Sequence, residues 1–181
     1  MLIQSNDQLI EFISKGGSPK YVYFWGHQKS NLGVTKSCFS QWYEADFQEN
    51  GVTFKTAEHY MMYHKAKLFG NEEIANKIIE CNHPGEAKQL GRKVTGFDDV
   101  VWNNNRFKIV TNASKLKFGQ NPELLTFLTN TGSRILVEAS PVDFIWGIGL
   151  AADNQLAEDP TNWAGLNLLG YALMSAREQL A

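Results

Sequence analysis

The sequence predicts an α+β fold, a single mainly helical domain over residues 1–181 with a small antiparallel sheet. Amphipathic helical patterns recur along most of the chain, whereas β-branched and aromatic runs typical of strands are few and short. No repeat, low-complexity segment or linker divides the 181 residues, and this length suits one domain with a substantial core. A hydrophobic content of 43% with 20% charged residues is typical of a soluble globular protein.

The rest of the chain is organised around residues 50–68. Asn50-Gly51 predicts a hairpin turn because Gly accepts the positive φ that such turns need, and residues 52–54 then form a short return strand. Thr56 is the expected N-cap of the following helix. Glu58 falls in its first turn, where the helix dipole favours a carboxylate. From this stretch alone, a capping glutamate at a solvated helix start is the commoner interpretation, and a site carboxylate is the alternative.

The other elements follow from helical periodicity, caps and breakers. Gly and Pro residues mark the turns between successive patterns. The predicted helices cover residues 5–14, the segment after 71, the segment from 84 to 91, 98–119, 121–132 and 163 onward. The predicted strands cover 21–25, 39–47 and 135–139. Residues 140–149 are expected to be irregular and Gly-rich, and residues 151–160 to form a polar loop.

The stretch from Pro141 to Gly149 carries an acid, a tryptophan and two glycines without any periodicity. It contains Asp143, Trp146 and Gly147. Glycines let backbone amides approach a ligand closely, and loops carry functional residues more often than cores do. An Asx turn after the proline, with Trp146 filling the core, is an equally good interpretation.

Further candidates lie on helices. Trp102 and Arg106 share one face of the helix predicted over 98–119, and an arginine on an apolar face needs an acid or an anionic ligand. A structural ion pair is at least as good an explanation for Arg106. Arg92 and Lys117 are weaker candidates for phosphate contacts. Asn167 does not point with the apolar residues of the last helix, so it either faces the cavity beside Trp146 or lies on the surface.

Composition excludes several classes of function. The formal net charge of −2 gives no basic field, so a nucleic-acid partner is not favoured. Cys38 and Cys81 have no metal or CxxC spacing and are expected to be free thiols in a reducing, cytoplasmic compartment. His59 and His64 are five residues apart, not four, so no helical metal site is expected. No apolar run suits a membrane span, and the N-terminus does not resemble a signal peptide.

Taken in order, a set of motifs resembles the NADAR superfamily of YbiA-like proteins. The similarity covers residues from about 21 to 178. The matching motifs are Phe24, Asn50-Gly51, Thr56-Ala-Glu58-His59-Tyr60, Lys65-Ala66, Leu90-Gly91-Arg92, Trp102, Lys117-Phe118-x-Gln-Asn121, Leu128-x-x-Thr131-Gly132, Leu136-Val-Glu-Ala, Asp143-x-x-Trp146-Gly147-x-Gly149 and Asn162-Trp163-x-Gly165-x-Asn167-x-Leu-Gly170-x-x-Leu-Met174-x-x-Arg177.

Two features depart from the family pattern. The family often has Ser-Asn-Phe before the turn, where this chain has Ser40-Gln41-Trp42. A long loop over residues 150–160 separates the Trp-Gly motif from the final helix. Both departures could alter the shape of the pocket and therefore the substrate.

The resemblance implies an N-glycosidase acting on a ribose-linked ligand, such as a phosphoribosylamino-pyrimidine intermediate of riboflavin synthesis. It also leaves two alternatives: a glycohydrolase that removes ADP-ribose from guanine bases of nucleic acid, and a non-catalytic NAD or ADP-ribose binding module. The resemblance assigns catalysis to Glu58, Asp143 and Trp102. Residues expected to bind the ribose-phosphate or ADP-ribose-type ligand are Trp146, Gly147, Asn167, Lys65, Arg92 and Arg106.

The expected mechanism divides two roles between the acids. Hydrolysis of an N-glycosidic bond builds positive charge on the ribose, so it needs a carboxylate near C1′, a positioned water and a proton for the leaving group. We expect Glu58 to be ionised at its helix N-terminus and to orient water or stabilise the ribose. We expect Asp143 to be the acid or a ligand of a ribose hydroxyl. The scheme needs no metal and no cofactor.

Overall fold

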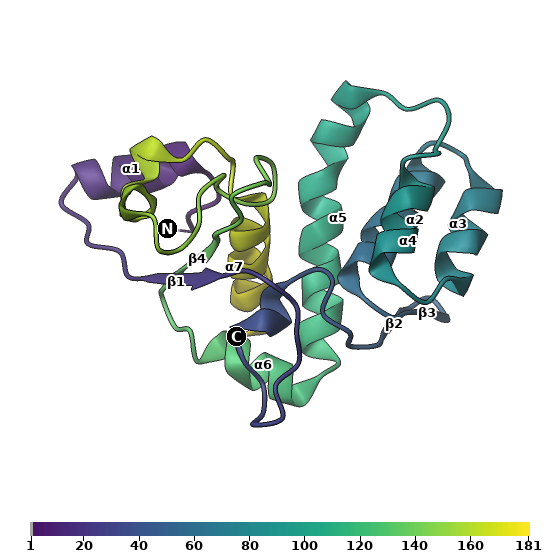
Figure 1. Ribbon diagram of the computed structural model, residues 1–181, viewed down its shortest axis with the longest axis horizontal. Helices are drawn as coiled ribbons and strands as arrows, with labels where there is room; N and C mark the ends of the chain where they lie inside the picture. Colours follow the sequence, from purple (N-terminus) through teal and green to yellow (C-terminus); the bar gives the residue numbers. More distant parts are fainter. Residues whose placement is uncertain (1) are drawn as a thin grey trace.

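A computed structural model describes residues 2–181 and confirms a mainly helical α+β fold (Figure 1). Seven α-helices lie within these residues, together with four short strands and three 3₁₀ helices. The helices are α1 (Asn6–Ser14), α2 (Ala57–Leu68), α3 (Glu72–Glu80), α4 (Pro84–Gly91), α5 (Asp99–Gly119), α6 (Pro122–Thr129) and α7 (Leu168–Leu180). The strands are β1 (Tyr21–Phe24), β2 (Phe47–Glu49), β3 (Val52–Phe54) and β4 (Ile135–Glu138), and the 3₁₀ helices are η1 (Lys36–Phe39), η2 (Gln155–Glu158) and η3 (Pro160–Asn162).

Helix α5 stands at the centre of the molecule and separates two groups of elements (Figure 1). On one side it packs against α2, which in turn packs against α3 and α4. On the other side it packs against α7, which covers β4. Buried residues of both sides form the main core, which includes Met61, Phe118 and Leu173. The segments on either side of α5 are therefore brought close together although they lie far apart in the sequence.

The strands form two pairs rather than one antiparallel sheet. Strand β1 pairs with β4 in parallel, with Tyr21 opposite Ile135 and Phe24 opposite Glu138. Strands β2 and β3 form the expected antiparallel hairpin, with Glu49 opposite Val52. The parallel pair joins segments distant in sequence, and such a pairing has no local turn signal from which it could be predicted.

The hairpin turn and the helix start after it are confirmed. Asn50 and Gly51 have φ of 51° and 81°, the two positive values that a type I′ turn requires. The hydroxyl of Thr56 accepts a hydrogen bond from the backbone N–H of His59 at 3.3 Å and caps α2. Glu58 is thereby fixed in the first turn of the helix.

Two boundary predictions are wrong. Residues 39–47 do not form a strand: η1 ends at Phe39, a turn follows, and the strand begins only at Phe47. The final helix begins at Leu168 and not at Trp163, because Asn167 takes a left-handed conformation with φ of 52°. The apolar pattern predicts Leu166 on the core face of this helix, but Leu166 lies before the helix and is 46% exposed. Within residues 2–181, we find no helix long and apolar enough to cross a membrane.

Candidate active site

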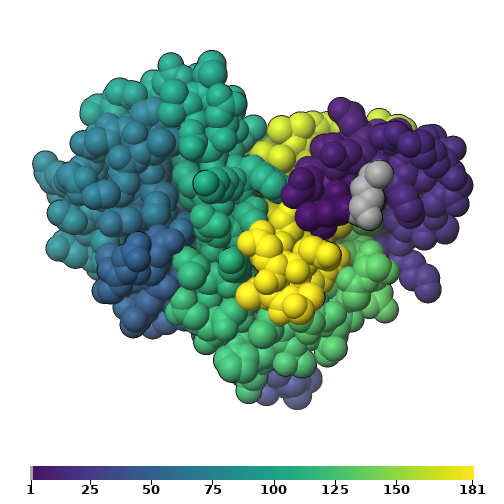
Figure 2. Space-filling model, turned by 180° about the vertical axis from the view of Figure 1, so that it is seen from behind, coloured from purple at the N-terminus to yellow at the C-terminus, as the bar shows by residue number. Residues whose placement is uncertain are grey.

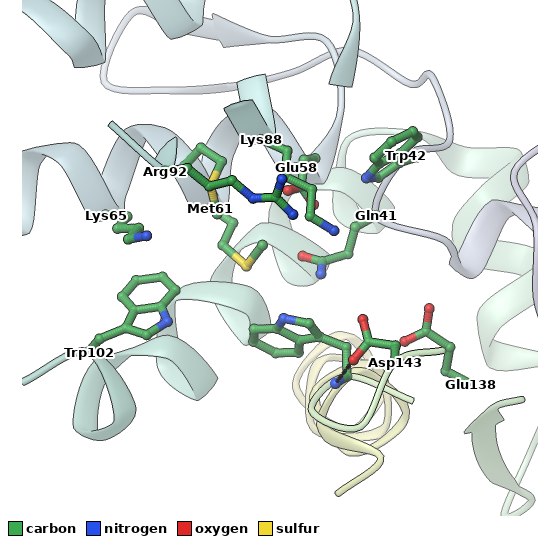
Figure 3. Close-up of a pocket in the computed structure, with 12 residues that line it drawn as sticks. Gln41, Trp42, Glu58, Met61, Lys65, Lys88, Arg92, Trp102, Glu138 and Asp143 are labelled. Carbon is green, nitrogen blue, oxygen red and sulfur yellow. Dashed lines mark hydrogen bonds between the residues drawn. The ribbon is translucent and has the colours of Figure 1, made fainter. Parts of the chain in front are cut away.

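A cavity of about 220 Å³ lies between the two sides of the molecule, lined by α2, α4, α5, β4 and the loop after β4 (Figure 3). The molecule is notched between these two sides when it is seen from behind (Figure 2). Other hollows are larger, at about 640 Å³, but they lack such a gathering of acids, cations and indoles. The residues that line the cavity are Gln41, Trp42, Glu58, Met61, Met62, Lys65, Lys88, Arg92, Trp102, Glu138, Asp143 and Trp146.

Glu58 is a buried carboxyl group in the wall of this cavity. It is 3% exposed, its Oε1 has no hydrogen-bond partner, and its backbone N–H donates to the carbonyl of Gln41 at 3.0 Å. Burial raises the pKa of Glu58 to about 7, against the opposing effect of nearby Lys88. The interpretation of Glu58 as a capping glutamate at a solvated helix start is therefore wrong. Desolvation also opposes the ionised form that the helix dipole was expected to favour. Glu58 exchanges its proton near neutral pH.

Asp143 lies across the cavity from Glu58 (Figure 3). Its Oδ1 accepts hydrogen bonds from the backbone N–H groups of Ile145 at 2.9 Å and Trp146 at 2.8 Å. The sequence left open whether this acid makes an Asx turn or belongs to a site. The structure shows the turn and also places Asp143 in the cavity lining. The two backbone bonds fix the direction of the carboxylate, and the same turn places Trp146 in the cavity wall.

Trp102 and Lys65 form one end of the cavity (Figure 3). The Lys65 Nζ lies 5.7 Å from the centre of the Trp102 ring and 4.6 Å from that of Phe97. Burial, together with the positive charge of Arg92, lowers the pKa of Lys65. A partly desolvated ammonium beside an open indole face can bind an anion while a flat group lies against the ring.

Three of the predicted ligand-binding residues lie outside the cavity lining: Arg106, Gly147 and Asn167. Arg106 is partly buried further along α5, where burial lowers its pKa. Gly147 packs so closely against β4 that an added Cβ would lie 2.9 Å from the carbonyl oxygen of Glu138. Its lack of a side chain therefore serves close packing.

Asn167 is fully buried and neither faces the cavity nor lies on the surface. Its Oδ1 accepts from the backbone N–H of Glu138 at 3.0 Å, and its Nδ2 donates to the carbonyl of Leu136 at 2.9 Å. Both interpretations from the sequence, a cavity residue and a surface residue, are therefore wrong. The side chain forms hydrogen bonds that connect the start of α7 to β4. Asn167 thereby holds the strand that ends at the cavity.

Six residues of the cavity lining were not predicted: the apolar Met61 and Met62, and the polar or aromatic Gln41, Trp42, Lys88 and Glu138. Trp42 and Gln41 belong to the segment that departs from the family pattern, which was the available signal for them. Glu138 stands in the matching Leu136-Val-Glu-Ala motif, but its role could not be inferred from strand periodicity. Lys88 is one of many exposed lysines, and nothing in the sequence marks it.

The prediction that Lys117 contacts a phosphate is also wrong, because its side chain is buried and already hydrogen-bonded. It is 1% exposed, and its Nζ donates to the carbonyls of Cys38 at 2.7 Å and Ser40 at 2.9 Å. Burial lowers the pKa of Lys117 to about 7. These bonds tie the turn before Gln41 and Trp42 to α5, so Lys117 shapes one wall of the cavity from behind.

The cavity combines carboxyl groups, cations and indoles. Carboxyl groups at the centre suit polar chemistry on a sugar, cations at the rim suit phosphate, and indoles suit a flat ring. Among residues 2–181, no group of three or more His, Cys, Asp or Glu side chains is arranged to hold a metal ion.

Comparison with known proteins identifies the family. The NADAR domain matches residues 23–181, and the chain belongs to this family. It is 46% identical to N-glycosidase R617 of Acanthamoeba polyphaga mimivirus, over 88% of this chain and 96% of that protein. It is 34% identical to the chloroplastic riboflavin biosynthesis protein PYRR of Zea mays, over 73% of this chain but only 21% of that protein. The NMR structure of YbiA from E. coli superposes with a TM-score of 0.67 at 25% identity, covering 91% of this chain and 86% of YbiA.

Proposed function

We propose that this protein is an N-glycosidase that hydrolyses the bond between a phosphorylated ribose and an amino-pyrimidine of the kind formed in riboflavin synthesis. Family membership and a relative named N-glycosidase at 46% identity make it an enzyme acting on N-glycosyl bonds. The riboflavin-type substrate is the finer part of the proposal, and the name of the maize relative supports it. The observation that carries the proposal is the placement of Glu58 and Asp143 on facing walls of one cavity.

The cavity suggests how such a substrate would lie. The ribose would occupy the centre, between the two acids, where positive charge develops as the bond breaks. Lys65, Lys88 and Arg92 form the cationic side and would bind the phosphate. Trp102 and Trp146 would enclose the base, since indole faces stack well on flat heterocycles. Substrate binding would exclude water from the acids and so strengthen their effect on the developing charge.

Two roles can be assigned to the acids. Asp143, held by two backbone N–H groups, would present its free oxygen to the ribose and stabilise the oxocarbenium-like transition state. Glu58, with a pKa of about 7, would take a proton from the attacking water. This scheme needs no cofactor. The cytoplasmic location expected from the sequence is part of the proposal.

The size and lining of the cavity also bear on the two alternatives, an ADP-ribosyl glycohydrolase and a non-catalytic binding module. ADP-ribose attached to a guanine base is much larger than an N-riboside 5′-phosphate, and a cavity of about 220 Å³, small beside the roughly 300–1,000 Å³ typical of ligand pockets, favours the smaller ligand. The net charge of −2 also gives no general attraction for nucleic acid. A non-catalytic binding module would need the indoles and cations but not facing acids. The smaller N-riboside 5′-phosphate is the better fit.

A substrate panel tests the proposal. The purified protein is incubated with ribosylamino-pyrimidine 5′-phosphates, with other N-ribosides and with oligonucleotides ADP-ribosylated on guanine, and release of free sugar phosphate or ADP-ribose is measured. We expect turnover of the ribosylamino-pyrimidine, and a loss of roughly 10²–10⁴-fold in Glu58→Gln with an unchanged fold. Release of ADP-ribose alone would replace the proposed substrate by the nucleic-acid one. Binding without any hydrolysis would favour the binding module.

A further inference from the structure

A third carboxyl group, Glu138, lies in the same cavity as Glu58 and Asp143 (Figure 3). Its Oε2 is buried and has no hydrogen-bond partner. The Oε1 of Glu58 and the Oε1 of Gln41 are buried and unpartnered in the same way. Buried polar atoms are nearly always paired, so this cluster indicates a place where a ligand or water supplies the missing partners.

The backbone of Glu138 is held more firmly than that of a typical loop residue. It is the last residue of β4 and lies opposite Phe24 in the parallel pair. Its N–H donates to Asn167 Oδ1 at 3.0 Å, and its carbonyl accepts from the N–H of Ile148 at 3.0 Å. Gly147 lies directly against the same carbonyl. Catalytic groups need this kind of fixed support, because small displacements reduce the rate strongly.

We propose that Glu138 is the general acid of the reaction, which gives its proton to the leaving nitrogen, and that Asn167 is its positioning residue. This inference rests on the proposed N-glycosidase function. It gives a specific role to a carboxyl group that the resemblance left without one, and it leaves Asp143 free to act on the ribose. It also gives a role to the buried asparagine just before α7, whose side chain is bonded to the end of β4.

The step balances with water as the only co-reactant. The oxygen of water forms a bond to C1′ while the C1′–N bond breaks, and the electron pair of that bond goes to the nitrogen. Glu138 gives its carboxyl proton to the nitrogen, which leaves as an amine. Glu58 accepts a proton from the attacking water, and this proton then passes through cavity water to Glu138. The products are the free base and the sugar phosphate, and both glutamates return to their starting states.

The protonation of Glu138 suits this role. Burial, together with the negative charges of Asp143 and Glu58, raises the pKa of Glu138 to about 8, against an opposing effect of Lys88. Burial also raises the pKa of Glu58, but two cations, Lys88 and Arg92, oppose that rise, whereas only Lys88 opposes it at Glu138. Glu138 is therefore the carboxyl group that holds its proton more firmly. Two carboxyl groups whose environments separate their pKa values can divide acid and base roles. The charged groups facing Glu138 across the cavity are Glu58 and Lys65 from α2, Lys88 from α4, Arg92 after α4, and Asp143.

The test compares Glu138→Gln with Glu123→Gln, a matched change at an exposed residue of α6. Both variants and the wild type are assayed for kcat and KM on the panel substrate that the wild type cleaves best, and melting curves are recorded. We expect Glu138→Gln to lose roughly 10²–10⁴-fold in kcat with little change in KM. Glu123→Gln should match the wild type.

A pH profile separates proton donation from a structural role. In the wild type, kcat should fall on the alkaline side as Glu138 loses its proton, and this limb should be displaced in Glu138→Asp, which keeps an acid at a changed distance. If Glu138→Gln fails to fold, the displaced limb in Glu138→Asp still decides the question. A folded Glu138→Gln with near-normal kcat, or an alkaline limb unmoved in Glu138→Asp, overturns this inference alone. A wild type inactive on the whole panel overturns the proposed function and this inference together.

Discussion

Trp102 shows how one residue can belong to both core and site. It is partly buried against the main core, yet it also lines the cavity with Lys65 Nζ 5.7 Å from its ring. A purely structural tryptophan would contribute several kcal/mol to stability, whereas one that stacks on a ligand contributes mainly to binding. The sequence placed Trp102 on an apolar helix face and could not separate these roles. The open cavity beside the ring favours the second role.

We predict that Trp102→Phe melts near the parent temperature but binds substrate more weakly, by part of the roughly 1–3 kcal/mol that complete loss of a stacked ring costs. Phenylalanine keeps most of the apolar bulk and loses part of the stacking surface. The measurement is a titration with the best panel substrate in a Glu58→Gln background, where turnover does not interfere, together with melting curves. A large fall in melting temperature with unchanged affinity of the folded fraction would assign Trp102 to the core instead.

At the scale of elements, the site depends on joints between segments far apart in sequence. Asn167 joins the start of α7 to β4, and Lys117 joins α5 to the turn after η1. Neither side chain lines the cavity, yet each holds a segment that does. A polar residue in a helical pattern gives no sign of such a partner, so both were first interpreted as ligand contacts or as surface residues.

For Asn167, we predict that replacement by Gly weakens the fold without adding backbone strain, because Gly tolerates the left-handed conformation. Two buried backbone groups, the N–H of Glu138 and the carbonyl of Leu136, would lose their partner. The expected cost is about 1–3 kcal/mol for each orphaned group, measured by chemical denaturation. Asn162→Ala, in the exposed part of η3, is the control and should be near neutral. Equal stability of the two variants would show that the hydrogen bonds between Asn167 and β4 do not stabilise the fold.

At the scale of the whole molecule, the free energy of unfolding depends on pH through the site, because carboxyl groups are buried where the two sides of the molecule meet. The folded pKa of Glu58 is about 7, above its ordinary value of 4.5, so the protonated form favours the fold. Stability from this group is complete below the unfolded pKa and is lost as the pH rises through the folded pKa. Its burial therefore makes the folded protein less stable on the alkaline side than an uncharged residue would.

We predict that Glu58→Gln becomes more stable relative to the wild type as the pH is raised from about 5 to about 8, by on the order of 2–3 kcal/mol. The amide cannot ionise, so this cost of burial disappears. Unfolding free energies of the two proteins are compared at each pH, and the difference removes the opposite titration of His59, whose pKa burial lowers to about 4. Parallel stability curves for the two proteins would contradict the burial of an ionisable Glu58.

The sequence by itself determined the local features of this protein. The positive φ values at Asn50-Gly51, the Thr56 cap and the Asx turn at Asp143 depend on neighbours a few residues away, so the residue types predict them. The helical composition and the family also follow from patterns along the chain. The description as a single domain and the cytoplasmic location stay predictions.

Only the tertiary structure decided how the site is assembled. Contacts between distant segments determine the parallel pairing of β1 with β4, the burial of Glu58 and the placement of Glu138 in the same cavity. A carboxyl group's protonation is set by the solvent and charges around it, which periodicity does not reveal. From its place in the first turn of a helix, Glu58 was therefore expected to be ionised. Its pKa is raised because the packing of the two sides of the cavity buries the carboxyl group.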